Sequence, residues 1–179
     1  MRRRPFRRPF RGNRPQRVPP ALRRANQLME TGNYPEAALA FEKIASRTEV
    51  RRGARAPIFH LRAGRAYILA NDVIKGMPHL KRGLSALAAK HQWEPLHRFG
   101  QRAVDELKEL NLNQEADEVA AFLADKLPEN AREQKADSHP ALPIQCPACG
   151  APLRLDEVMW IDQDTAECAF CGNPVRGED

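Results

Sequence analysis

The sequence has 179 residues, of which 42% are hydrophobic and 29% are charged. This length allows one domain of medium size or two small ones. No run approaches the roughly 20 apolar residues of a membrane-spanning helix, and no apolar segment of the secretory type follows the Arg-rich N-terminus. We therefore expect a cytoplasmic protein without a membrane span or an export signal.

The net charge of +6 is unevenly distributed along the chain. Residues 1–24 contain ten arginines and no acidic residue, whereas residues 25–140 are close to neutral. Residues 141–179 contain two arginines and seven acidic residues, a balance of −5. This asymmetry indicates different partners for the two ends of the chain.

Residues 1–18 are expected to form a disordered tail, because prolines interrupt any helix and the arginines repel one another. Arginine binds phosphate in a bidentate manner, and the interleaved Phe6 and Phe10 suit stacking on unpaired bases. The tail thus favours a polyanion, RNA above all; a solvated tail with weak, salt-sensitive affinity is the alternative. The candidate polyanion-binding residues are Arg2, Arg3, Arg4, Arg7, Arg8, Arg11, Arg14 and Arg17.

Apolar residues recur with a helical period from about residue 20 to residue 127. A first helix with Leu22 and Ala25 on its apolar face is predicted to end at Gly32, and Pro35 suits the first turn of the next helix. That second helix carries Phe41 on its apolar face. The segment therefore predicts a helical hairpin.

The hairpin recurs at a spacing of 39 to 40 residues. Three kinds of position align: small or modest residues at a close helix contact, bulky apolar residues that face a neighbouring helix, and Gly or Asn residues that tolerate the left-handed conformation ending a helix. In that order, the aligned sets are Ala25, Gly64 and Val104; Leu28, Tyr67 and Leu107; and Gly32, Asn71 and Asn111. Phe41 aligns with Leu80 and then with Ala120, so the third copy is the weakest.

The turn from Gly32 through Tyr34 to Ala37, with Phe41 four residues later, resembles the tetratricopeptide repeat. The resemblance covers roughly residues 18–127 as three copies, and it implies an α-solenoid whose first helices line a concave groove for a partner peptide or helix. Another type of α-solenoid is the alternative. The candidate groove residues, which equally suit a core, are Leu22, Met29, Ile58, Leu61, Arg65, Ile68 and Leu69.

The second copy contains Gly76 and Pro78 where its second helix should run. Because proline disrupts a helix interior, we expect that helix either to begin near Pro78 or to be kinked. After the third copy, residues 128–144 are polar with three prolines, which predicts a linker that lets the last segment move independently.

Four cysteines form two Cys-x-x-Cys-Gly motifs separated by 18 residues. In a reducing compartment such pairs more often hold a metal than form disulfides. Each motif predicts a tight turn that brings two thiolates to one ion, with Gly150 and Gly172 at positive φ. The predicted metal ligands are Cys146, Cys149, Cys168 and Cys171.

This spacing resembles the zinc-ribbon family over residues 144–175, which implies a structural zinc ion in a hairpin. The strand candidates are residues 153–155 and 158–161, covered by Leu155, Trp160 and Phe170. Because ~35 residues cannot bury enough core to fold alone, the metal must supply the missing free energy. Iron, two disulfides and a thioredoxin-type redox pair are the alternatives.

We expect a mostly α protein with an Arg-rich tail (1–18), tetratricopeptide-like repeats (19–127), a linker (128–144) and a β zinc ribbon with four cysteine ligands (145–179). No catalytic constellation is evident, and four cysteine ligands leave no open metal position. We therefore predict a non-enzymatic adaptor that binds partner proteins through its helices and its acidic ribbon. The alternative is an RNA- or ribosome-associated factor anchored by the tail.

Overall fold

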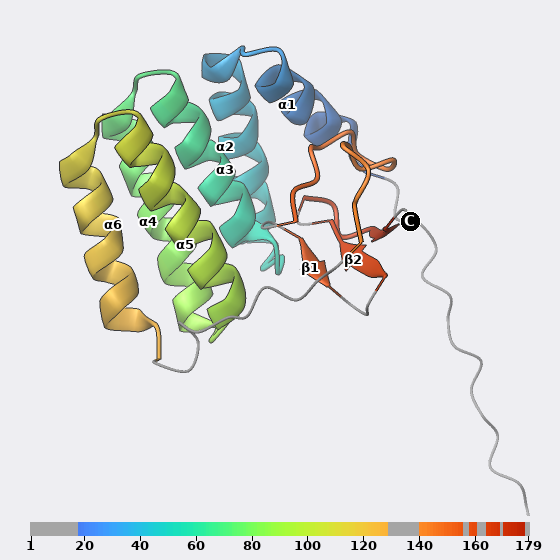
Figure 1. Cartoon of the computed structure of the whole chain (residues 1–179). Coiled ribbons are helices and arrows are strands. Elements are labelled where there is room, and N and C mark those ends of the chain that lie inside the picture. Colours follow the sequence, from blue (N-terminus) through green and yellow to red (C-terminus); the bar gives the residue numbers. More distant parts are fainter. Residues whose placement is uncertain (1–17, 129–139, 156–157, 161–163, 169, 178–179) are drawn as a thin grey trace, which may run out of the picture.

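A computed structural model describes residues 18–128, 140–155, 158–160, 164–168 and 170–177. Each helix packs against the next in the chain, so that the helices stand side by side, and the C-terminal segment lies beside the α1 end of the row (Figure 1). The expectation of a mostly helical protein with a small C-terminal sheet is confirmed. The elements are α1 (Pro20–Glu30), α2 (Tyr34–Val50), α3 (Ala56–Leu69), α4 (Val73–Ala89), α5 (Trp93–Glu109), α6 (Asn113–Lys126), β1 (Met159–Trp160), β2 (Thr165–Glu167) and β3 (Pro174–Arg176).

The same turn closes all three hairpins. The residue that ends the first helix of each pair has a positive φ: 74° at Gly32, 62° at Asn71 and 61° at Asn111. The next N–H then donates to a carbonyl five residues earlier, a pattern that satisfies the free carbonyls of a helix end. These bonds are Asn33 to Leu28 at 2.9 Å, Asp72 to Tyr67 at 2.9 Å and Leu112 to Leu107 at 2.8 Å. The predicted left-handed turns are therefore confirmed.

Helices α3 and α4 approach each other closely at Gly64. A Cβ atom at Gly64 would lie 2.8 Å from the Leu80 nitrogen and 2.9 Å from the Gly76 carbonyl oxygen. Both neighbours are backbone atoms, which cannot move aside as a side chain would. The small residue expected at this position is thus required by the approach of the two backbones.

Helix α4 begins at Val73 and continues through Pro78 to Ala89, so the expectation of a helix beginning near Pro78 is wrong. The Asp72 side chain accepts a hydrogen bond from the Lys75 N–H at 3.1 Å and fixes the helix start. Pro78 has no N–H for the carbonyl of Ile74. Ile74 is 89% exposed, so water can satisfy that carbonyl and the early proline is tolerated.

The buried apolar residues form two clusters that meet at α3. One cluster joins α1, α2 and one side of α3, through Phe59 and Tyr67, to the C-terminal segment. The other joins the opposite side of α3, through Leu61 and Ile68, to α4, α5 and α6. Helix α3 is therefore buried along nearly its whole circumference.

Gly64→Ala should lower the free energy of unfolding by about 1–3 kcal/mol, because the added methyl group meets backbone on α4. In an unhindered helix, alanine is more stabilising than glycine by ~1 kcal/mol. A net loss of stability in the Gly64→Ala protein would therefore show that the steric cost exceeds this gain. Urea denaturation gives the measurement. Ser85→Ala on the exposed side of α4 is the control, and a Gly64→Ala protein as stable as this control would contradict the prediction.

Candidate metal centre

The two cysteine motifs fold into equivalent turns. In the first, the Gly150 N–H donates to the Cys146 carbonyl at 2.9 Å; in the second, the Gly172 N–H donates to the Cys168 carbonyl at 2.8 Å. Both glycines have positive φ, 71° and 70°, as the sequence predicts. Each turn is closed by the first cysteine, whose N–H donates to the carbonyl of the residue five positions later.

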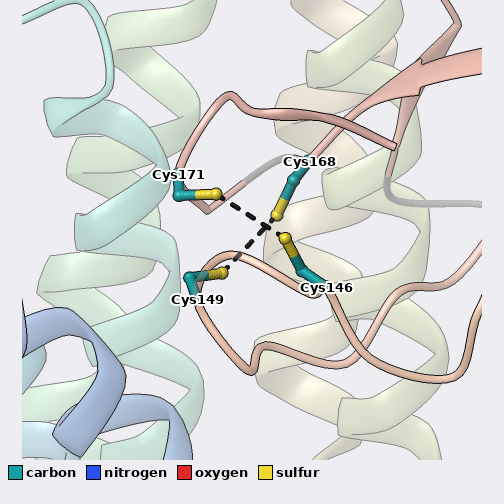
Figure 2. Close-up of side chains that lie close together, drawn as sticks. All are labelled: Cys146, Cys149, Cys168 and Cys171. Carbon is teal, nitrogen blue, oxygen red and sulfur yellow. Dashed lines mark hydrogen bonds between the residues drawn. The ribbon is translucent and has the colours of Figure 1, made fainter. Parts of the chain in front are cut away.

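The turns face one another, so that the four cysteine side chains converge from two loops (Figure 2). All four sulfurs lie within 4.8 Å of one another, and none of the cysteines is more than 7% exposed. The Sγ atoms of Cys146 and Cys171 are 3.7 Å apart, and those of Cys149 and Cys168 are 3.8 Å apart. A tetrahedral ion with ~2.3 Å metal–sulfur bonds needs sulfurs ~3.8 Å apart, so the cluster fits one metal ion.

The acid–base state of the thiols would change if such an ion were bound. Contacts with the neighbouring sulfurs, together with burial, raise the pKa of Cys149 and of Cys168. Without a cation these two thiols stay protonated at neutral pH, because adjacent buried negative charges repel one another. A metal ion reverses the preference and displaces the protons. The Asn173 side-chain N–H donates to the Cys171 sulfur at 3.5 Å and orients that side chain.

Three short antiparallel strands follow the first turn, in the order β1-β2-β3. Strand β1 falls within the expected strand 158–161, but residues 153–155 form no strand. Pro152, which cannot donate to a ladder, makes only an isolated bridge with Gln145. Phe170 is buried as expected, whereas Leu155 is 52% exposed; the side chain of Trp160 lies outside what the structure describes.

The segment around the cysteines, residues 140–177 where described and hereafter called the ribbon, packs against the helices. The Arg62 guanidinium of α3 lies 3.7 Å from the centre of the Phe170 ring, and the Asn26 amide of α1 donates to the Cys149 carbonyl at 3.4 Å. Arg55 pairs with Glu167, and Arg98 of α5 donates to the Val158 carbonyl. Sequence reasoning missed these contacts, which join residues up to 123 positions apart.

Arg62 is almost completely buried, with 4% of its surface exposed. Burial lowers its pKa to about 9; Arg65 adds to this effect, and Glu106 and Cys168 oppose it. The guanidinium therefore remains charged at neutral pH. Arg62 thus lies on the side of α3 that contacts the ribbon.

The candidate groove residues fall into two groups. Leu22, Leu61 and Ile68 are buried in the core, at 3%, 5% and 8% exposure, as the alternative interpretation expects. The other four are half-buried and line two cavities that the ribbon also lines. Ile58 belongs to a cavity of about 570 Å³ beside Cys168 and Cys171, and Met29, Arg65 and Leu69 belong to one of about 190 Å³ beside Phe170.

The geometry defines a protein with a six-helix bundle and a C-terminal cluster of four cysteines. No family model, curated protein or solved structure matches the chain. Among the described helices, none has both the length and the apolar character needed to cross a membrane. The Arg-rich tail lies outside the described residues but for Val18, and so does most of the expected linker.

A second polar cluster, which sequence reasoning also missed, joins α2, α3 and α4. The Nδ1 atoms of His60 and His79 are 3.0 Å apart, so one proton must lie between two ring nitrogens. The other nitrogen of His60 faces Glu49 at 3.4 Å, and that of His79 faces Glu42 at 3.8 Å. The two histidines are 19 residues apart and lie on the two helices of the second hairpin. The repeat alignment already assigns them to these helices, so it could have indicated that they are near each other.

Replacing Cys149 and Cys168 by serine together should abolish metal binding and leave the helices folded. Structural zinc contributes about 10 kcal/mol or more to folding in small zinc-finger peptides, so the ribbon should lose its fold with the metal. Elemental analysis should find one metal ion per chain in the unaltered protein and less than a tenth of that in the variant. Ala148→Ser, in the same turn, is the control and should retain the ion.

Stability should decline as the pH falls through the range set by His60. Burial lowers the pKa of His60 below its usual value near 6.5, with Glu49 opposing this effect. The unfolded chain therefore binds a proton that the folded chain does not, so stability is complete above about pH 6.5 and is lost as the pH falls toward the folded pKa.

Urea denaturation between pH 7.5 and pH 5 tests this expectation. His60→Gln should reduce the dependence of stability on pH, whereas His91→Asn, at an exposed position with a positive φ, should leave it unchanged. An equal pH dependence in the His60→Gln protein would rule out His60 as the group responsible.

Proposed function

We propose that the four cysteines bind a structural zinc ion. The sulfur–sulfur distances of 3.7 and 3.8 Å support a tetrahedral ion, and a set of four thiolates is typical of zinc or of iron bound to sulfur. Four buried cysteines occupy every position of a tetrahedral site, so no position is left for a catalytic water. The ion's role is then to hold the two turns together.

We further propose that the six helices form a solenoid of tetratricopeptide type. Three hairpins with the same turn, at Gly32, Asn71 and Asn111, support this proposal. So does the close backbone contact at Gly64, the counterpart of Ala25 in the first copy. In such a solenoid the helices offer an extended surface for a partner protein.

The function that these features favour is that of a non-enzymatic, cytoplasmic adaptor, with the helices and the zinc ribbon as its two binding surfaces. The observation that carries the proposal is the closed, buried sulfur cluster that shares an apolar core with the helical body. A site closed in this way stabilises structure, whereas catalysis by a metal needs an exchangeable ligand.

Affinity capture with the whole chain tests the adaptor function. Partners should be retained by the unaltered protein, and a defined subset should be lost when Cys149 and Cys168 are both replaced by serine. Mass spectrometry of the two samples, with Ala148→Ser as the control, identifies that subset. Identical partner sets, or no protein enriched over a bare matrix, would contradict the proposal.

A second candidate function is that of an RNA- or ribosome-associated factor. It is favoured by the ten arginines in residues 1–24, which have no acidic residue among them. Phosphate contacts weaken steeply with salt, so nucleic acid bound by the tail should raise the 260/280 nm absorbance ratio of the purified protein and leave in a high-salt wash. A chain lacking residues 1–18 should copurify with none.

A further inference from the structure

The ribbon occupies the surface that the helical repeats would otherwise present. We call that surface the first-helix face, because it is formed by the first helix of each hairpin. It is defined by four residues: Asn26 on α1, Arg55 at the start of α3, Arg62 within α3, and Arg98 on α5. Each of these side chains contacts the ribbon. A partner cannot use the same face while the ribbon lies on it.

Most contacts across this boundary share one chemistry. At these four positions the helices contribute three guanidinium groups and one amide, all of which are cations or donors; the reverse case is Glu30 of α1, whose carboxylate accepts from the Gln145 amide of the ribbon at 3.0 Å. The ribbon contributes the Glu167 carboxylate, the Phe170 ring and the carbonyls of Cys149 and Val158. Four thiolates around a dication add a formal charge of −2 immediately behind Phe170. Metal binding thus makes the ribbon a better partner for an arginine-rich face.

The boundary is incompletely packed. A cavity of about 570 Å³ lies between the second cysteine turn and the helices, bordered by Leu22, Ile58, Phe99 and Phe170. Side chains at a permanent interface interdigitate as they do in a protein core. Apolar residues of the ribbon and of α1, α2 and α3 are buried in one cluster, but this cavity leaves the part of the boundary beside Ile58 and Phe99 unfilled, which lowers the cost of separating the two surfaces.

We propose that the first-helix face is a docking surface shared by the ribbon and by a partner protein, and that the metal decides between them. The metal-loaded ribbon covers the face. When the metal is lost the ribbon leaves, and the face then binds an acidic, aromatic segment of a partner with the spacing of Glu167 and Phe170. This inference rests on the proposed adaptor function, since it identifies the partner's chemistry.

The first experiment follows the position of the ribbon in the whole chain, by small-angle scattering with and without a strong zinc chelator. Chelation should increase the radius of gyration.

Arg62→Gln should increase the radius of gyration as well while retaining one metal ion per chain, because this change removes the contact with Phe170 but no metal ligand. Glu167→Gln is a second variant should Arg62→Gln lose its helical circular dichroism, and Arg47→Gln, exposed on α2, is the control.

The second experiment titrates a synthetic peptide of residues 164–173, with serine in place of both cysteines, into the whole chain. The chelated chain should bind it at least ten times more tightly than the metal-loaded chain, and a peptide with Gln for Glu167 and Ala for Phe170 should lose that binding. An unchanged radius of gyration on chelation, or equal affinity in both states, would overturn the proposal. Because neither experiment needs a natural partner, failure of the adaptor function would be seen separately.

Discussion

The ribbon contains too few apolar side chains to enclose a core of its own, and this constraint shapes the rest of the structure. Its buried apolar residues, among them Val158, Ala166 and Phe170, belong to the same cluster as residues of α1, α2 and α3. Two substitutes therefore replace an independent interior: the sulfur cluster within the ribbon and the helix surface beneath it. The ribbon lies against the helices because it cannot bury its apolar residues by itself.

Coupling the ribbon to the helices places arginine where an apolar residue would be usual. Arg62 is buried, and its guanidinium carbon lies 3.7 Å from the centre of the Phe170 ring, a cation–π contact in which the charge is kept. An aliphatic residue at position 62 would make no cation–π contact with the Phe170 ring and would bring no charge to the side of α3 that faces the ribbon. The position thus combines a packing role with an electrostatic one.

Those features of the fold that depend on neighbouring residues could be predicted from the sequence. The hairpin turns follow from Gly or Asn at a fixed spacing, and the two cysteine turns follow from the Cys-x-x-Cys-Gly motifs, because both are decided within a few residues. The expected strand at residues 153–155 was wrong because Pro152 limits pairing there. The contact of the ribbon with the helices could not be predicted, since Arg55 and Glu167 are 112 positions apart and neither has a local signal for the other.

Helix α3 has a consequence for how the molecule comes apart. Its two sides belong to different apolar clusters, one shared with the ribbon and one shared with α4, α5 and α6. Cooperative units of a protein coincide with such clusters. The helical body should therefore unfold in two stages, in which α1 and α2 separate, with the ribbon if it is still bound to them, while the remaining helices persist. Helix α3 contributes residues to both units, so the stability of each depends on it.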